Sequence, residues 1–115
     1  MGGMLLTLLV ASAVLAHHGW RWTADGNVEL TGVIKEVRLG NPHGRVTLQV
    51  EQEQWLVEVG QPWRNASAGV TDEMLSPGIE ITAIGQRSAD PDERRLKAER
   101  LRIGGREYVL YPDRD

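Results

Sequence analysis

The chain contains no cysteine and no phenylalanine among its 115 residues. The absence of cysteine excludes disulfide bridges, thiolate zinc sites and cysteine nucleophiles. There is also no excess of positive charge, because 13 Lys and Arg stand against 16 Asp and Glu, for a formal net charge of −3. Nucleic acids and anionic membranes usually attract a net basic surface. We therefore expect neither as a partner, and the length fits a single domain.

The beginning of the chain lacks basic residues, since no Lys or Arg precedes Arg21. Residues 4–16 are apolar or small throughout. Even with Met1 to Gly3 included, this stretch is shorter than the roughly 20 residues that a membrane-spanning helix needs. It ends in Val14-Leu15-Ala16, a pattern typical of a signal-peptidase site.

We therefore predict a signal peptide over residues 1–16 and one mature domain over residues 17–115, with no membrane span after cleavage. The expected location is the periplasm or the medium of a bacterium. Cleavage after Ala13 is a second option, because Ala11-Ser12-Ala13 fits the same pattern. An uncleaved membrane anchor is the alternative to export.

Several short runs alternate apolar and polar residues and predict β-strands. In the first run the apolar positions change parity after Ile34, which predicts a bulge, and Gly32 is the residue most able to allow a bend. The predicted strands cover residues 28–39, 46–50, 55–59, 79–83 and 96–103, with residues 108–111 as an extension.

Residues 61–78 show no period of two. Pro62 suits a first helical turn, and residues 71–75 predict a short capped helix that Pro77 and Gly78 close. Three strands, a helix and two strands is the order of an OB-fold barrel. We predict an all-β fold with one short helix, a small OB-like β-barrel of five to six strands. A small β-sandwich has the same number of strands and is the alternative.

The three histidines fall at two places, His17 and His18 at the predicted mature terminus and His43 in the turn 40–44. An N-terminal histidine offers a metal ion its imidazole and its α-amine, whose pKa is about 7.7–8.0. A second imidazole would complete three nitrogen donors, which suits Cu(II). We predict a copper site from His17 and His43, with His18 as the ligand that could contribute instead of His43. In the alternative, the paired histidines are a solvated terminus and His43 only caps its turn.

The four tryptophans are the large anchors of the chain. Trp20 and Trp22 follow the histidines closely, so their rings can pin the terminus to the barrel or shelter a metal. Trp55 alternates with Val57 and Val59 and is expected in the core. Trp63 follows Pro62 and can plug the end of the barrel.

Four segments carry a resemblance to a known family. They are Ala16-His17-His18-Gly19-Trp20, residues 28–34, Gly40-Asn41-Pro42-His43 and Leu75-Ser76-Pro77-Gly78. With these segments the chain resembles DUF6152, a family of small exported bacterial proteins of unknown function. The resemblance implies an exported, single-domain, OB-like barrel and implies no activity. Members often have Ser where this chain has Gly19.

Two hypotheses about function follow. The first is a periplasmic metal-binding protein that captures or transfers Cu(II). The second is an interaction module that needs no metal and docks a partner protein or small molecule on the barrel face. Its candidate contacts are Trp20, Trp22, Trp63 and Asn41. No nucleophile motif or phosphate loop occurs, so we do not expect an enzyme, although an unrecognised catalytic site stays open.

Overall fold

The computed structural model describes residues 19–114. The predicted signal peptide lies outside these residues. Six strands form one sheet, and a helical connection separates the third strand from the fourth. The elements in chain order are β1 Val28–Arg38, β2 Arg45–Val50, β3 Glu53–Glu58, α2 Pro62–Ala68, η1 Asp72–Leu75, β4 Glu80–Arg87, β5 Arg95–Ile103, β6 Arg106–Val109 and η2 Pro112–Arg114.

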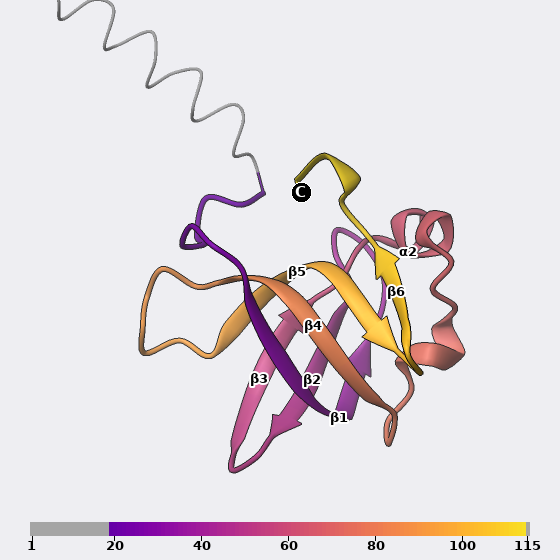
Figure 1. The fold of residues 1–115 in the computed structure, drawn as a ribbon, viewed down its shortest axis with the longest axis horizontal. Coiled ribbons are helices and arrows are strands. Elements are labelled where there is room, and N and C mark those ends of the chain that lie inside the picture. The colour runs from indigo at the N-terminus through magenta and orange to yellow at the C-terminus, as the bar shows by residue number, and fades with distance from the viewer. Residues whose placement is uncertain (1–18, 115) are drawn as a thin grey trace, which may run out of the picture.

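The sheet closes into a five-stranded barrel with one added strand (Figure 1). The strand order is β3-β2-β1-β4-β5-β6, and all neighbours in that order are antiparallel. Parallel pairing of β3 with β5 closes the barrel over three residue pairs, which run from Leu56 with Arg95 to Glu58 with Lys97. The predicted OB-like barrel is therefore confirmed, and the alternative of a sandwich is wrong.

Strand β1 is long because it serves both halves of the barrel. Its first half pairs with β4 and its second half with β2. A shift of register between Ile34 and Glu36 marks the bulge. The predicted bulge thus exists but lies beyond Gly32. Gly32 is needed for a different reason, because a Cβ atom there would collide with the backbone carbonyl of Gln49 on β2.

The core fills the inside of the barrel with the apolar residues of the alternating pattern. Trp55 belongs to it, as predicted, with 7% of its surface exposed. The other core residues are Ile34, Val46, Leu48, Val57, Val59, Val70, Leu75, Ile81, Ala83, Leu96, Ala98, Leu101 and Leu110.

The connection between β3 and β4 differs in detail from the prediction. The α-helix is at Pro62–Ala68, where Pro62 fits the first turn and Gly69 ends the helix in a left-handed conformation with φ of 90°. Residues 72–75 form a 3-10 turn, and the side chain of Thr71 makes no capping hydrogen bond. The expected capped helix at 71–75 is therefore wrong in type. Its Leu75 still reaches the core.

Within residues 19–114, no helix has the length and apolar character to cross a membrane.

Candidate functional site

Of the three predicted metal ligands, the structure places only His43. His17 and His18 lie outside the described residues. His43 is half-buried in the loop between β1 and β2, and Asn41 in the same loop is exposed. Trp20 is buried, so the chain is already packed on the barrel one residue after Gly19, where the description begins.

Three parts of the chain that are distant in sequence meet at one end of the barrel. Figure 1 draws the segment after residue 18, the loop between β1 and β2 and the C-terminal segment at the same end, with α2 beside them. Two contacts agree with this view: the Lys97 ammonium donates a hydrogen bond to the Gly19 carbonyl at 3.0 Å, and the Trp20 and Tyr111 rings meet edge to face at 5.2 Å. The side chains gathered here are called the barrel-end cluster below. They are Trp20, Trp22, His43, Glu58, Arg64, Arg95, Lys97 and Tyr111.

Lys97 is the centre of this cluster. It extends from β5 on the outer side of the barrel, yet only 1% of it is exposed. Its ammonium lies 3.9 Å from a Glu58 carboxylate oxygen and 5.0 Å from the centre of the Trp20 ring. Burial lowers the pKa of Lys97 below its ordinary value, and the negative charge of Glu58 opposes that change. Because a buried ammonium is costly unless it is paired, these contacts are what keep Lys97 in place.

Glu58 is shared between two cations. Arg95 forms an ion pair and two hydrogen bonds with its Oε2 oxygen, and Lys97 approaches its Oε1 oxygen. The Arg95 guanidinium also stacks on the Trp22 ring, with its carbon 3.8 Å from the ring centre. Trp22 is thus held against the barrel through Arg95.

A second ion pair anchors the C-terminal turn beside the cluster. Arg114 lies 3.7 Å from a carboxylate oxygen of the buried Glu99, and its guanidinium carbon is 3.9 Å from the centre of the Trp20 ring. Trp20 is therefore packed between the ring of Tyr111 and the guanidinium of Arg114. Burial raises the pKa of the Tyr111 hydroxyl, and the positive charge of Arg64 opposes this.

The imidazole of His43 has a ring nitrogen without a hydrogen-bond partner among the described residues. Burial lowers its pKa below the ordinary value of 6.5, and the positive charge of Lys97 lowers it further, while Glu58 opposes both. The ring is therefore neutral at pH 7. Its Nδ1 atom is buried and has no hydrogen-bond partner among residues 19–114. A neutral imidazole with a free nitrogen is the form that ligates metal ions.

The described residues alone do not complete a metal site. Between Gly19 and Arg114, no group of three or more His, Asp or Glu side chains is arranged to hold a metal ion. His43 would have to share an ion with donors from outside this range. The only other histidines of the chain are His17 and His18.

Trp63 does not plug the barrel, contrary to the expectation. It is 58% exposed at the start of α2. The guanidinium of Arg64 lies between two rings, with its carbon 4.5 Å from the centre of the Trp63 ring and 4.1 Å from that of Tyr111. Arg64 also donates a hydrogen bond to the Leu110 carbonyl. Trp63 is thus an exposed aromatic side chain at the edge of the cluster.

Sequence reasoning missed the charged members of the cluster. Lys97 and Glu99 alternate with Leu96 and Ala98 on β5, a pattern that predicts charged side chains in water. They are buried because the segment after Gly19 and the C-terminal turn cover the outer side of β5. No signal within the strand itself points to that cover.

The comparisons with known proteins bear on the family and the fold. A family model described as "Family of unknown function (DUF6152)" matches residues 6–97. Among solved structures, a chain from the crystal structure of the S. pombe Stn1-ten1 complex is similar, with a TM-score of 0.54 and 15% sequence identity. The similarity covers 67% of this chain and 57% of that chain, and at such low identity it shows the fold alone. No curated protein matches the chain.

Proposed function

Because the chain belongs to DUF6152, a family of unknown function, we propose a role that rests on the barrel-end cluster: the protein is exported to the bacterial periplasm and captures or transfers Cu(II). The proposed ligands are the α-amine and imidazole of His17, after cleavage behind Ala16, and the imidazole of His43. His18 is the alternative ligand in place of His43. The observation that carries the proposal is the buried, unpartnered Nδ1 of a neutral His43.

A buried polar atom without a partner costs free energy of about 1–3 kcal/mol. Such atoms are few in folded proteins, and ion binding is one of the ordinary explanations for them. A copper ion on Nδ1 would remove this cost. The lowered pKa of His43 also favours metal binding, because protons do not compete with the metal for the ring at neutral pH.

The path of the chain makes a shared site with His17 sterically reasonable. The Gly19 carbonyl is held by Lys97, and the charge of Lys97 acts on His43. The described chain begins at Gly19, beside Lys97 at the end of the barrel on which His43 sits, and this supports the proposal of a shared site.

The charges around His43 favour exchange over permanent binding. Lys97, Arg64 and Arg95 act on it with positive charge and Glu58 alone with negative charge. A doubly charged cation would be bound against this positive field, so its affinity would be lower than the same three nitrogen donors give in a neutral setting. Moderate affinity suits a protein that takes up copper and passes it on.

The experiment that tests the proposal is a Cu(II) titration of protein exported from a bacterial host. Intact mass first establishes whether the chain begins at His17. Calorimetry and EPR then compare the wild type with His43→Ala and with a variant that carries one extra Ala before His17. We expect one copper per chain and a nitrogen-rich EPR spectrum. Each change should weaken binding by at least about tenfold, because even the loss of an outer-sphere partner costs about 10–100-fold.

Trp63→Ala is the control for this titration, since its side chain is exposed and has no proposed ligand role. Its copper affinity should equal that of the wild type. Binding that is weak and indifferent to both histidine changes would end the copper proposal, and so would a mature chain that begins elsewhere yet binds copper equally well.

The exposed ring of Trp63 favours a second candidate, an interaction module that docks a partner protein. A tryptophan stacked with an arginine at the surface is the combination that often dominates binding energy in protein interfaces. A photo-crosslinking residue at position 63, introduced in the producing host, should give one discrete adduct for a docking module. A matching probe at Glu73 on η1 serves as control, and equal labelling at both positions would argue against this candidate.

A further inference from the structure

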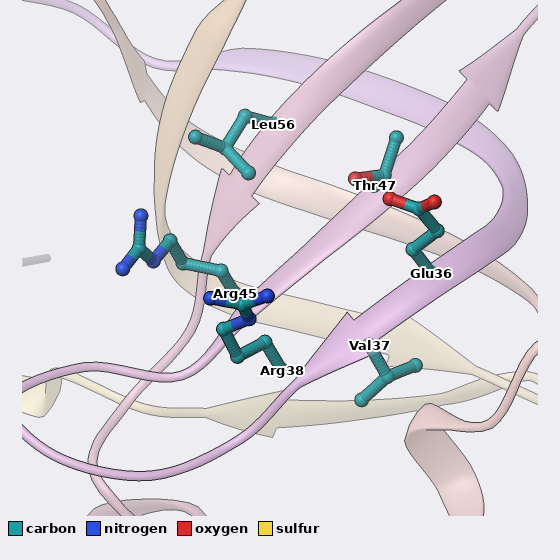
Figure 2. Close-up of a pocket in the computed structure, with 6 residues that line it drawn as sticks. All are labelled: Glu36, Val37, Arg38, Arg45, Thr47 and Leu56. Atoms are coloured by element: carbon teal, nitrogen blue, oxygen red, sulfur yellow. The ribbon is translucent and has the colours of Figure 1, made fainter.

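A second candidate site lies on the outer side of β1, β2 and β3. It is a hollow of about 510 Å³, lined by Glu36, Val37, Arg38, Arg45, Thr47 and Leu56 (Figure 2). This volume is within the range of about 300–1,000 Å³ that is typical of pockets for small molecules. His43, the one histidine among residues 19–114, does not line it.

Two arginines of this hollow face each other across neighbouring strands. Arg38 on β1 and Arg45 on β2 are paired residue to residue in the antiparallel register. Both side chains are exposed, and within residues 19–114 neither forms an ion pair or a hydrogen bond. Like charges directly opposite each other destabilise an antiparallel pair. The hollow therefore holds two guanidinium groups, on residues paired in register, for which the described part of the chain supplies no direct ion pair.

The carboxylates nearest in the sheet are not available to these arginines. On its other side, Arg45 is paired in register with Glu58 of β3. Glu58 is buried and bound by Arg95, with Lys97 near its second oxygen. Glu36 lines the hollow, but Figure 2 shows its carboxylate beside Thr47, while the guanidinium groups of Arg38 and Arg45 lie toward the opposite side.

We propose that this hollow binds a small molecule through an oxyanion group, a carboxylate or a phosphate, held by Arg38 and Arg45. Guanidinium groups bind such oxyanions with two parallel charge-assisted hydrogen bonds. The Leu56 side chain, half-buried in the lining, would contact the apolar body of the ligand. Glu36 would repel a second negative group, so the hollow favours a ligand with a single oxyanion.

The test is an NMR titration of the ¹⁵N-labelled protein at low ionic strength. Inorganic phosphate is the probe in one arm and butanoate, a carboxylate with an apolar chain, in the other. Sodium chloride at matched ionic strength is the blank. The variants are Arg38→Gln and Arg45→Gln. The matched control is Arg106→Gln, because Arg106 on β6 is also an exposed arginine without an ion pair among the described residues.

We expect saturable shifts confined to β1, β2 and β3 around the hollow. Each of the two variants should weaken binding by about tenfold or more, the usual effect of losing a charge-assisted hydrogen bond. Arg106→Gln should leave the affinity unchanged. Stronger binding of phosphate identifies a phosphate ligand, and stronger binding of butanoate identifies a carboxylate; either supports the proposal.

Shifts that stay linear, that sodium chloride reproduces, or that Arg106→Gln weakens as much as the other variants would overturn it. The outcome is independent of copper, since the titration contains no metal and no histidine is changed.

Discussion

Replacing Lys97 by methionine should destabilise the folded protein by about 1–3 kcal/mol. The ammonium of Lys97 donates a hydrogen bond to the Gly19 carbonyl at 3.0 Å, and hydrogen bonds of charged groups contribute about 1.5–3 kcal/mol. It also lies 5.0 Å from the centre of the Trp20 ring and 5.7 Å from that of Tyr111, and such cation–π contacts contribute about 0.5–2 kcal/mol. Burial of the charge, which also lowers the pKa of Lys97, offsets part of this gain.

Methionine has nearly the length of lysine and needs no hydration, so Lys97→Met removes the bonds without leaving a cavity. It also leaves Glu58 paired with Arg95. The loss should therefore stay below the 3–5 kcal/mol or so that a stranded buried charge costs. For a domain of this size, each kcal/mol lowers the melting temperature by about 4–8 °C.

Glu58→Gln should be worse, at about 3–5 kcal/mol, because it strands the buried ammonium of Lys97. The loss of the Glu58 charge should cost less free energy at Arg95 than at Lys97, since 30% of the Arg95 side chain is exposed to water. The double variant Lys97→Met with Glu58→Gln has no ammonium at position 97 that could be left unpaired. The destabilisation of the double variant should therefore be clearly smaller than the sum of the two single effects. Urea denaturation at pH 7, followed by circular dichroism and tryptophan fluorescence, measures all three.

Strictly additive effects, or a Lys97→Met variant as stable as the wild type, would refute this reasoning. Either result would mean that Lys97 does not hold the segment after Gly19 to the barrel. The support for a site shared by His17 and His43 would then be lost as well.

Two further predictions concern stability. Asn65 is buried and bonds both the N–H and the carbonyl of Gly60, so Asn65→Leu should cost about 2–3 kcal/mol in urea denaturation, against about 0.5 kcal/mol or less for the exposed Ser67→Ala. His43 has a lowered pKa in the folded state, so the unfolded chain binds that proton more tightly. Relative to His43→Gln, the wild type should lose stability as the pH falls below 6.5 toward the lowered pKa, and the difference should be constant above that range; a parallel pH profile for both proteins would contradict this.

Most of the barrel could be predicted because a half-buried strand leaves a period of two in the sequence. Trp55, Val57 and Val59 are one example, and all three are in the core. The change of parity after Ile34 predicted a bulge, and the register shift lies between Ile34 and Glu36. The bend was assigned to Gly32 because glycine allows one, whereas the shift lies beyond that residue, since a one-residue insertion shows in the parity of a strand and not in the residue type.

The candidate site could be predicted only where rare residues mark it. His43 is one of three histidines, and the structure gives it a buried, unpartnered nitrogen. Lys97 and Glu99 could not be predicted, because the burial of Lys97 depends on a segment about 80 residues away in the chain and that of Glu99 on the C-terminal turn, which cover β5 from outside. The proposed sharing of a metal with His17 and His18 stays a prediction.

The pairing that closes the barrel involves residues of the barrel-end cluster. Three parallel residue pairs between β3 and β5 close the barrel, and Glu58 with Lys97 is the last of them. The side chains of that pair also approach each other within 3.9 Å. The ion pairs of Glu58 therefore stabilise the parallel pairing of β3 with β5 that closes the barrel. Detaching the segment after Gly19 would remove a hydrogen-bond partner of Lys97 beside this pairing, so it would destabilise the whole barrel and not the terminal segment alone.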